Sequence, residues 1–538
     1  MNKRTLIILL ALFLLISLVF HLYKINQVPP CLNADEAAHG YNAYSILKTG
    51  RDEYGNFLPL RFRSFEDYKL PLYVYLSVPF IKIFGLNDFS IRFLNLIIGI
   101  LLVPLMYLVV KEIFNDQKIA LIASFLTSVS PWIYILSRHA HEGALCAFFT
   151  LLSIYFLIKF NKKLRFFDFL LTNASLLLAI FSYHTGRIFL IFIILYQIVI
   201  LYRSKRKICF KNKTLTMGII LFVLIFPFFI DARYGVNRLN NLLFFKNIGF
   251  QLRLNEYLGE HPLRIFHNKG TEAIREISNR YFSQLSPEFF LTWGDKNPRF
   301  GFQNLGVITP IEYIFFFIGI YYLFKNKEKY RYLIFFLFLI SPIGNALTWQ
   351  DYSLTRNYFM IFPMIFSVSY GFFYFLSAIK KTEFKTLTLT IIGLIFFFYL
   401  LNNWDIYFNH YPKRAWVVRA WQCGYKELAN YVKQNYGRFN NFYITDRYGQ
   451  PYIFILYYLS YDPVKYQKQA KISAPDQYGF GQVEHFDKFY FKFKFDKNLK
   501  KTAFIGFPDQ FNDLGLDQAK IKKIKIGNEE IFWIYEGV

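Results

Sequence analysis

Long, nearly uncharged apolar runs constrain this chain more than any other feature. Each run has roughly 20 residues, the length a helix needs to cross a hydrocarbon core of about 30 Å. Hydrophobic residues make up 54% of the 538 residues and aromatic residues 21%, more than an ordinary soluble domain contains. A soluble fold could not bury this much apolar surface. The sequence therefore predicts a multi-pass α-helical membrane protein.

The first run, Thr5 to Leu22, follows Lys3 and Arg4. It is too long for the apolar core of a signal peptide and lacks a small-x-small cleavage site, so we interpret it as a retained anchor. Together with it, about eleven spans are expected. The others are residues 91–110, 119–136, 143–160, 166–183, 188–202, 215–231, 308–324, 332–348, 357–379 and 386–401.

The charged loops predict the orientation of these spans. Lys and Arg in short loops are retained on the cytoplasmic side, and alternate loops are basic. The loops assigned to the inside on this basis are 159–165, 203–213, 325–331 and 380–385. Loop 24–90, loop 232–306 and the C-terminal region 402–538 then lie outside, in a plasma-membrane protein. We expect two domains, a membrane catalytic module at 1–401 and an extracytoplasmic α/β domain at 402–538.

The formal net charge of +26 is mostly explained by this topology. A basic nucleic-acid binder would concentrate its charge on one face of a polar domain, with stacking aromatics beside it, and no segment has that character. The sequence thus excludes nucleic acid as the expected partner and leaves membrane lipids.

The C-terminal region has a different texture from the rest. A helix is predicted over Trp416–Tyr436, and the run Tyr452–Leu459 is too short to span a membrane, so it should pack into the core of this domain. Short strands are predicted at 442–445, 489–495, 502–506, 521–526 and 531–535.

The four cysteines show no metal-ligand spacing. One hypothesis is a disulfide between Cys31 and Cys423. A Glu/His site for a divalent metal is left open, with no metal ligand assigned and no cofactor required.

The densest polar cluster follows the first span, in NADEAAHGYNAYSIL (residues 33–47). A carboxylate of Asp35 or Glu36 beside the bilayer could take a proton from a hydroxyl nucleophile, because partial desolvation raises its basicity. Equally, Asn33 or Asp35 could cap the helix that follows. His39 and Tyr41, in the same stretch, are candidates for contact with a sugar or an acceptor.

Later in this loop, Glu66, Asp67 and Lys69 precede an apolar, Pro-containing segment typical of a helix lying in the membrane interface. The two acids are candidate sugar or acceptor ligands. Lys69 could bind a phosphate, although a lysine here more often extends its ammonium to the interface.

Charged groups recur at the outer ends of later spans. Arg138 and Glu142 follow the third span, and His184 and Arg187 lie between the fifth and sixth. Ionisable groups at membrane depth tend to line functional cavities, and Arg is suited to bidentate phosphate contact. Interhelix pairing, such as Arg138 with Glu142, is the competing interpretation.

A third group lies in FLTWGDKNPRFGFQNLGVITPIEY (290–313) and NALTWQDYSLTRNYFMIFP (345–363). Gly, Pro and Asn there indicate ordered turns. Asp295, Asn297 and Asp351 are candidate sugar or acceptor ligands and Arg356 a candidate phosphate ligand. Asp/Arg pairing within the loops is the alternative.

Taken in order, these motifs resemble the polyprenol-phosphate-sugar-dependent glycosyltransferases of the GT-C fold, which include protein O-mannosyltransferases and aminoarabinose transferases. The motifs are the acidic pair, DYKLPLY (67–73), SRHAHEGA (137–144), YHTGR (183–187), GDKNPR (294–299) and LTWQDYSLTRNY (347–358). Leu70 departs from the pattern, since related chains often have a second proline there. The HPP-type loop of eukaryotic mannosyltransferases is absent from the sequence.

The resemblance implies a sugar donor linked to polyprenyl phosphate and a protein, glycan or lipid acceptor. It implies that Asp35 is the general base, supported by Glu36, and that the reaction inverts the anomeric carbon. Lys69 and Arg187 match family positions best among the groups that would stabilise the leaving phosphate; Arg138, His184 and Arg356 are the further candidates. Two rival functions stay open, a transporter of lipid-linked sugars and a noncatalytic envelope-assembly subunit.

Overall fold

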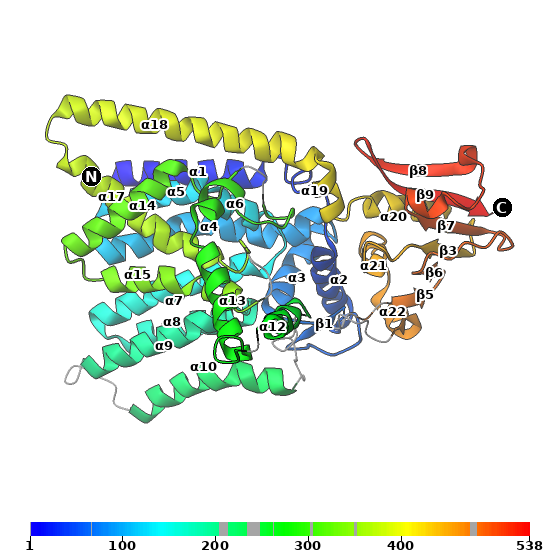
Figure 1. The fold of residues 1–538 in the computed structure, drawn as a ribbon, viewed down its shortest axis with the longest axis horizontal. Coiled ribbons are helices and arrows are strands. Elements are labelled where there is room, and N and C mark those ends of the chain that lie inside the picture. Colours follow the sequence, from blue (N-terminus) through cyan, green and yellow to red (C-terminus); the bar gives the residue numbers. More distant parts are fainter. Residues whose placement is uncertain are drawn as a thin grey trace. The chain divides into compact units, whose positions relative to one another are not determined.

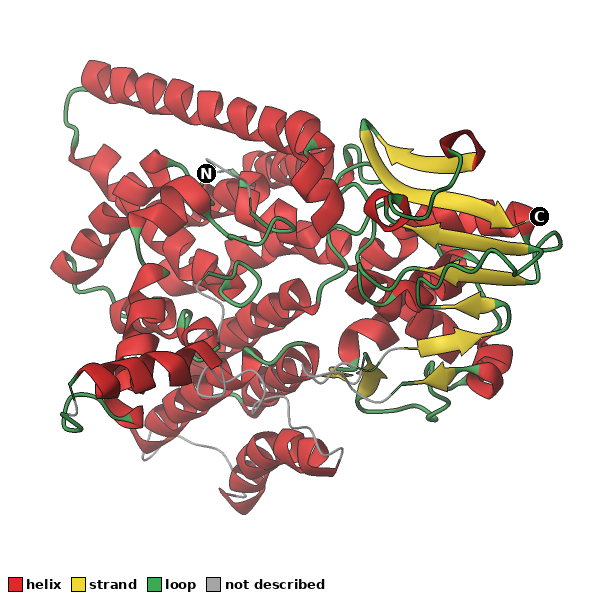
Figure 2. Cartoon of the chain, turned by 45° about the vertical axis from the view of Figure 1, so that its right-hand side comes forward, coloured by secondary structure: helices red, strands yellow, loops and turns green. Residues whose placement is uncertain are grey.

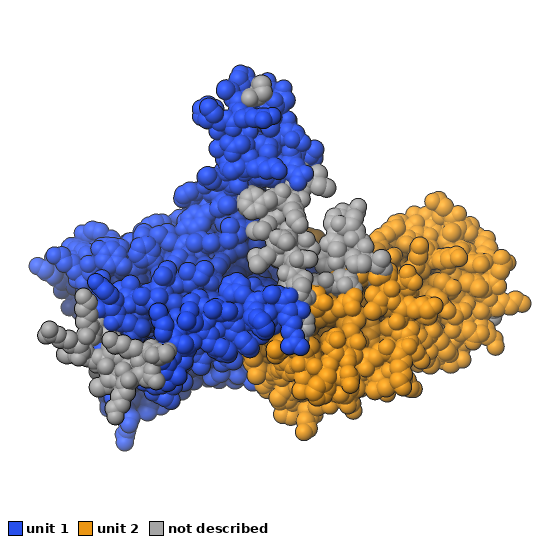
Figure 3. Space-filling view, turned by 90° about the horizontal axis from the view of Figure 1, so that it is seen from below, with its two compact units in different colours: residues 1–23, 95–137, 142–406 blue, residues 24–94, 138–141, 407–538 orange. Residues whose placement is uncertain are grey.

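The computed structural model describes residues 2–65, 67–203, 213–233, 248–261, 263–301, 305–348, 352–473, 481 and 483–537. Helices make up most of the described chain, and all its strands except a short pair at residues 62–69 gather in its C-terminal part (Figures 1 and 2). Two compact units can be distinguished, which Figure 3 colours separately. Unit 1 contains residues 1–23, 95–137 and 142–406, and unit 2 contains residues 24–94, 138–141 and 407–538.

Unit 1 is helical throughout its described part. Its elements are α1 (Lys3–Leu22), most of α4 (Asp88–Phe114), α5 (Gln117–Val129), α6 (Pro131–Ser137), α7 (Glu142–Lys163), α8 (Phe166–Ser182), α9 (Gly186–Arg203), α10 (Lys213–Arg233), α12 (Ile248–Glu260), α13 (Lys269–Ser283), η2 (Glu288–Trp293), α14 (Pro310–Lys325), α15 (Arg331–Ile340), α16 (Ile343–Ala346), η3 (Tyr358–Met360), α17 (Ile361–Ala378) and α18 (Thr382–Asp405).

The predicted spans lie mostly in helices, although 119–136 is divided between α5 and α6 and 332–348 between α15 and α16. A multi-span membrane protein is thus confirmed. Among the described residues, seven helices are long and apolar enough to cross a membrane, or eight if one bent pair is a single span. That pair is α5 and α6, which meet at 51° where Pro131 begins the second helix. A proline cannot donate the backbone hydrogen bond that would continue α5. The expected number of eleven spans stays a prediction.

Helices α14 and α17 pack closely because glycines face each other at their contact. A Cβ on Gly319 would lie 1.9 Å from the carbonyl oxygen of Ser367, and one on Gly371 would lie 2.5 Å from the amide nitrogen of Gly319. Small residues let membrane helices approach to backbone contact. An apolar cavity of about 320 Å³ is lined by residues of α1, α5, α14, α17 and α18, including Phe13 and Phe396.

Unit 2 combines the first long loop with the C-terminal region. The loop contributes α2 (Ala34–Thr49), β1 (Phe62–Ser64), β2 (Asp67–Lys69), α3 (Leu72–Phe84) and the first turns of α4. The C-terminal region contributes the helical elements η4 (Ile406–His410, of which Ile406 belongs to unit 1), η5 (Tyr411–Lys413), α19 (Ala415–Ala420), α20 (Tyr425–Asn435), α21 (Pro451–Tyr458), α22 (Pro463–Gln469), η6 (Pro508–Phe511) and η7 (Gln518–Lys520). Its strands are β3 (Asn441–Ile444), β4 (Lys471–Ile472), β5 (Val483–Phe486), β6 (Phe489–Tyr490), β7 (Thr502–Gly506), β8 (Ile521–Ile526) and β9 (Glu529–Gly537).

The strands of the C-terminal region form one mixed sheet of seven, in the order β4-β5-β6-β3-β7-β9-β8, and Figure 2 shows them side by side. Strand β3 runs parallel to β6 and β7, and the outer pairs are antiparallel. Helix α21, which covers the predicted core run Tyr452–Leu459, is buried except at Tyr458, which is only partly exposed. The α/β character of this region is thus confirmed.

Two predicted elements of this region differ from the structure. The helix predicted over Trp416–Tyr436 breaks into α19 and α20, and α20 begins after Gly424, whose φ of +99° lies in the left-handed region that favours glycine. The strand predicted at 489–495 ends at Tyr490, because Phe493 and Phe495 leave the sheet to pack on the rings of Phe511 and Tyr535.

Candidate active site

The acidic pair lies in the first turn of α2, whose beginning is set by its cap. Asn33 adopts extended backbone, and its side-chain oxygen accepts a hydrogen bond from the amide of Glu36, while the Glu36 carboxylate accepts one from the amide of Asn33. This reciprocal pair is a capping box, which satisfies amides that the helix itself leaves without partners. The capping interpretation is therefore confirmed for Asn33, whereas Asp35 lies inside the first turn of α2.

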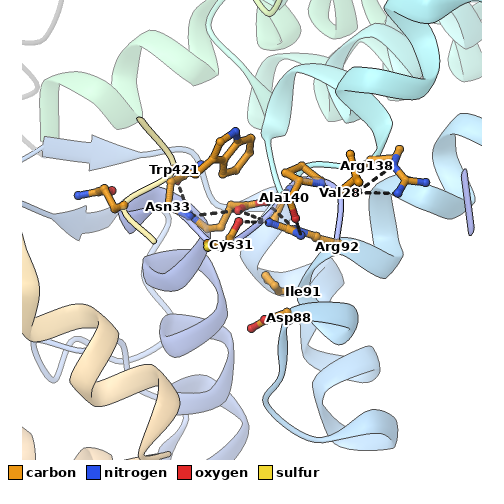
Figure 4. A network of polar contacts seen from close by, with 12 residues as sticks. Val28, Cys31, Asn33, Asp88, Ile91, Arg92, Arg138, Ala140 and Trp421 are labelled. Carbon is orange, nitrogen blue, oxygen red and sulfur yellow. Dashed lines mark hydrogen bonds and ion pairs between the residues drawn. The ribbon is translucent and has the colours of Figure 1, made fainter. Parts of the chain in front are cut away.

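Glu36 is 1% exposed, and both of its carboxylate oxygens are engaged. One oxygen accepts from Nε of Arg92 at 3.1 Å and from the amide of Ala140 at 2.7 Å. The other accepts from Nη2 of Arg92 at 2.9 Å and from the amide of Asn33 at 3.2 Å. Figure 4 shows this network. With four donors in place, Glu36 anchors the surrounding backbone and has little capacity left for a substrate proton.

Two buried arginines hold the segment that precedes α2. Arg92 also donates to the carbonyl oxygens of Pro29 and Cys31. Arg138 donates twice to the carbonyl oxygen of Val28, at 3.1 and 2.6 Å, and Figure 4 shows its guanidinium turned toward that residue. Burial of a guanidinium is tolerated when carbonyl and carboxylate oxygens surround it. Arg138 thus has structural partners here, and its predicted role toward a phosphate stays a prediction.

Asp35, the neighbour of Glu36, has the opposite environment. Its side chain is 54% exposed, and Oδ1 accepts a hydrogen bond from Nζ of Lys69 at 2.6 Å. The Lys69 side chain is only 8% exposed and also lies over the ring of Phe65. The Lys69 ammonium is therefore held within the fold by Asp35 and Phe65. The structure places a held ammonium beside a carboxylate that solvent can reach.

A second carboxyl group in the same unit is buried near Lys69. Glu53 is 1% exposed and accepts hydrogen bonds from Nδ2 of Asn42 at 3.1 Å and from the hydroxyl of Tyr452 at 3.3 Å. Its pKa is raised to about 8, mainly by desolvation and to a smaller extent by the charge of Asp52, against the lowering effects of the Asn42 hydrogen bond and the Lys69 charge. A neutral, hydrogen-bonded carboxyl group thus lies within electrostatic range of the Asp35–Lys69 pair near neutral pH.

The other candidates in the first loop are partly accounted for. His39 is buried with its ring 5.2 Å from that of Tyr73. Tyr41 is buried and donates its hydroxyl to the carbonyl oxygen of Tyr461, and desolvation raises the pKa of Tyr41. Glu66 lies outside the described residues. Asp67 is in β2, where its backbone pairs with Ser64.

In unit 1 the structure brings the two later loops together. Asp295 is 6% exposed, and its carboxylate accepts from the amide of Asn297 at 2.8 Å and from the amide of Leu354 at 2.7 Å. Desolvation raises the pKa of Asp295 to about 6, against the opposing effects of these amides and of the Arg356 charge. Asp295 therefore ties residues 295–297 to residues 352–356. Asp351 lies outside the described residues.

Arg356 donates from Nη1 to the hydroxyl of Thr348 at 2.7 Å and to the side-chain oxygen of Asn345 at 3.4 Å. Asn297 accepts from the amide of Arg299, which closes the turn that the Gly, Pro and Asn content predicts. These contacts show ordered loops. The sugar and phosphate roles of Arg356 and Asn297 stay predictions.

The remaining candidates also belong to unit 1. Arg187, in the first turn of α9, forms an ion pair with Asp231 near the end of α10, and both side chains are mostly buried. His184 lies in the turn before α9, where its carbonyl oxygen accepts from the amide of Arg187. Glu142 is the first residue of α7 and is 9% exposed. A phosphate would have to compete with Asp231 for the guanidinium of Arg187.

Across the described segments of the chain, no three His, Cys, Asp or Glu side chains gather closely enough to hold a metal ion. The predicted pairing of cysteines, in contrast, is confirmed, because Cys31 and Cys423 form a disulfide. This bond joins the residue two positions before the α2 cap to the turn between α19 and α20.

Comparison with known proteins agrees with this architecture. Residues 69–230 match the family model described as dolichyl-phosphate-mannose-protein mannosyltransferase. The structure of ArnT from Cupriavidus metallidurans bound to undecaprenyl phosphate is similar over 99% of this chain and 98% of its own, at 11% identity and a TM-score of 0.56. The chain therefore shares the fold of this membrane protein, a GT-C fold.

Further comparisons set the extent of this similarity. The GT-C protein ArnT in its apo state matches at 10% identity and a TM-score of 0.55, again over 99% of this chain. The archaeal oligosaccharyltransferase AglB from Archaeoglobus fulgidus, in complex with an inhibitory peptide and a dolichol-phosphate, matches at 12% identity and a TM-score of 0.49. The match covers 85% of this chain and 63% of the archaeal one. No curated protein sequence matches the chain.

Four residues that the sequence reasoning did not single out shape the cluster in unit 2. They are Arg92, Glu53, Trp421 and Gln422. Arg92 lies at the start of a predicted apolar span, and the only local sign of its role is a charged residue at the boundary of that span. Glu53 belongs to an Asp-Glu pair before a turn glycine, a pattern common in exposed loops. For Trp421 and Gln422, the one available signal was the neighbouring Cys423, whose hypothesised disulfide with Cys31 would bring this turn to the start of α2.

Proposed function

We propose that this chain transfers a sugar, a hexose or a pentose, from a polyprenyl-phosphate carrier to the hydroxyl of a protein, glycan or lipid acceptor, with Asp35 as general base and inversion at the anomeric carbon. The proposal builds on the GT-C fold. It extends to an active site on the extracytoplasmic side of the plasma membrane, with residues 1–401 as the catalytic module and 402–538 as an outer domain.

The observation that carries the proposal is the division between two adjacent acids. Glu36 accepts hydrogen bonds from four donor atoms and is almost fully buried, whereas the Asp35 side chain is 54% exposed and forms an ion pair with Lys69. A general base must reach the proton that it accepts. Of the two, Asp35 alone meets this requirement, and the anchoring of Glu36 holds it in place.

In the proposed step, the acceptor hydroxyl gives its proton to the Asp35 carboxylate as its oxygen forms a bond to the anomeric carbon. The bond from that carbon to the phosphate oxygen breaks, and the polyprenyl phosphate leaves with the electron pair. Attack from the face opposite the leaving group inverts the configuration. Nζ of Lys69 lies 2.6 Å from Oδ1 of Asp35. A bound phosphate would share this ammonium, which would release the carboxylate for proton transfer and stabilise the leaving group.

The other cations take graded places in the proposal. Arg187 is paired with Asp231, and Arg356 donates to neutral side-chain oxygens. In both cases a phosphate could take the place of these partners. Arg138 is fully buried on the carbonyl of Val28. We therefore rank Lys69 first, Arg187 and Arg356 next, and Arg138 and His184 last as ligands of the donor phosphate.

Two features support a lipid-linked donor and an outer site. The apolar cavity of about 320 Å³ among α1, α5, α14, α17 and α18 offers hydrocarbon surroundings for part of an isoprenoid chain. The disulfide of Cys31 with Cys423 joins the loop that carries Asp35 to the C-terminal region. Disulfides persist in oxidising compartments, which supports an extracytoplasmic position for both segments.

The test is transfer by purified protein in liposomes that contain polyprenyl phosphate carrying a radiolabelled sugar, with cell-envelope extract as the acceptor. We expect Asp35→Asn to abolish transfer while leaving expression and folding intact, because the amide keeps the shape but cannot take the proton. Mass spectrometry of the labelled product identifies both sugar and acceptor.

Asp88→Asn is the matched control. Asp88 also lies in the first turn of a helix of unit 2, and it also pairs with a lysine, Lys426, at 2.9 Å. It should retain activity because its ion pair is not part of the proposed chemistry. Transfer by Asp35→Asn at the rate of Asp88→Asn would remove Asp35 from the mechanism.

A further inference from the structure

The C-terminal region contacts the base of α2 through three consecutive residues, Trp421, Gln422 and Cys423. All three are buried, and they form the turn that separates α19 from α20. Because α2 carries Asp35 in its first turn, this contact links the C-terminal region to the proposed general base. We infer that Trp421, Gln422 and Cys423 are positioning residues that hold Asp35 in its reactive place, an inference that rests on the proposed function.

Gln422 provides the most direct of the three contacts. Its side-chain oxygen accepts a hydrogen bond from the amide of Ala34 at 2.9 Å, and its side-chain nitrogen donates to the carbonyl oxygen of Tyr448 at 2.7 Å. The first amides of a helix have no partner within the helix. Asn33 satisfies the amide of Glu36, so Gln422 and Asn33 together cap the residues on either side of Asp35.

Cys423 and Trp421 fix the backbone on the other side of the cap. The disulfide to Cys31 restrains the chain two residues before Asn33. The Trp421 ring lies 5.7 Å from the Arg92 guanidinium and 4.8 Å from the ring of His139, and its Nε1 donates to the hydroxyl of Tyr411. Figure 4 shows Trp421 beside Asn33 and Cys31. Arg92 in turn holds Glu36, so the ring supports the acidic pair from a second direction.

These contacts fix the position of the Asp35 carboxylate and do not bind the substrate. The contacts described for the three residues go to Ala34, Cys31 and Arg92, which surround Asp35, so the three are assigned to positioning and not to the chemistry. A carboxylate that must meet a hydroxyl within hydrogen-bond distance loses rate steeply when its backbone moves by a fraction of an ångström. We therefore expect loss of these contacts to lower kcat for transfer and to leave KM for the lipid-linked donor nearly unchanged.

The experiment compares Gln422→Met with Gln510→Met in the full-length protein. Gln510 is a matched control, because its side-chain oxygen also accepts from a backbone amide at a helix start, that of Phe507 at 2.9 Å, but within the C-terminal sheet region. Hydrogen–deuterium exchange is followed in the peptide that covers residues 32–38. We expect Gln422→Met to speed exchange at the Ala34 amide about tenfold, the equivalent of one lost hydrogen bond, and Gln510→Met to leave it unchanged.

The same proteins are then assayed for transfer. We expect kcat to fall about tenfold in Gln422→Met, with an unchanged KM for donor, and to stay at the wild-type value in Gln510→Met. The variant Cys31→Ala/Cys423→Ala provides a second, independent measurement, since it removes the covalent restraint and should also speed exchange in residues 32–38 and lower kcat.

The exchange measurement does not depend on transfer, so failure of this inference and failure of the proposed function can be told apart. Unchanged exchange in Gln422→Met, or faster exchange with an unchanged kcat, overturns the positioning role. A wild-type protein that shows the exchange pattern but transfers no sugar overturns the proposed function instead.

Discussion

Replacing Glu36 by glutamine separates the structural acid from the proposed catalytic one. Glu36 accepts four hydrogen bonds, two of them from Arg92, and both side chains are about 1% exposed. Glutamine keeps the shape but carries no charge. Its amide nitrogen, placed where a carboxylate oxygen was, would also face donors and could accept from none of them.

The magnitude follows from the burial of the pair. Removing one partner of a buried ion pair leaves an uncompensated charge in the interior and costs about 3 to 5 kcal/mol. Asp35→Asn acts on an ion pair whose carboxylate is 54% exposed, and pairs that water can screen contribute about 1 kcal/mol or less. We therefore expect Glu36→Gln to be less stable than Asp35→Asn by roughly 2 to 4 kcal/mol.

The assay is thermal unfolding of the detergent-solubilised proteins, followed by intrinsic fluorescence, with wild type and Asp88→Asn alongside. Glu36→Gln should unfold at a clearly lower temperature than the other three and lose activity through misfolding, whereas Asp35→Asn should be folded and inactive. Equal unfolding temperatures for Glu36→Gln and Asp35→Asn would show that the four hydrogen bonds do not stabilise this segment, and the reasoning from burial would be refuted.

Three further predictions concern other charged groups. The pKa of Glu53 is raised to about 8, so the folded state binds this proton more tightly than the unfolded state. The free energy of unfolding should therefore fall as pH rises from about 4.5 to 8. In thermal unfolding measured across that range, Glu53→Gln should make this fall smaller. Asp295→Ala removes the acceptor shared by the amides of Asn297 and Leu354, so we expect a loss of about 1 to 3 kcal/mol and faster hydrogen exchange at both amides. Lys69→Met should reduce transfer far more than Lys69→Arg, because arginine keeps the positive charge beside Asp35; equal rates for the two variants would argue against a role for that charge.

Much of the fold follows from local properties of the chain. The length and apolar character of each run are sufficient to make it a membrane helix. In hydrocarbon, backbone N–H and C=O groups without hydrogen bonds are too costly, and a helix pairs all of them within one segment. Local signals also mark several boundaries, such as Asn33 before α2 and Pro131 at the bend between α5 and α6. Strands β7 and β8 match their predicted ranges. β7 is a short, mostly apolar run and β8 alternates apolar and charged residues, and turn residues bound both.

The candidate site was only partly predictable. The acidic pair and Lys69 could be proposed from their order along the chain and from family resemblance. Their contact at 2.6 Å could not, because β2 brings Lys69 to α2 across 34 positions. Arg138 shows the limit of such reasoning. The local sequence around an arginine near an outer helix end is the same whether its guanidinium binds a phosphate or a backbone carbonyl such as that of Val28.

The sequence by itself determined that the chain inserts in a membrane as many helices and that two adjacent acids follow the first of them. Only the tertiary structure decided which acid is buried and which is exposed. Neighbouring residues on a helix point in directions about 100° apart, so the two acids face different surroundings. Glu36 is the buried acid because Arg92 and the amide of Ala140 bind its carboxylate. These partners lie 56 and 104 residues away in the sequence, so no local pattern could indicate them.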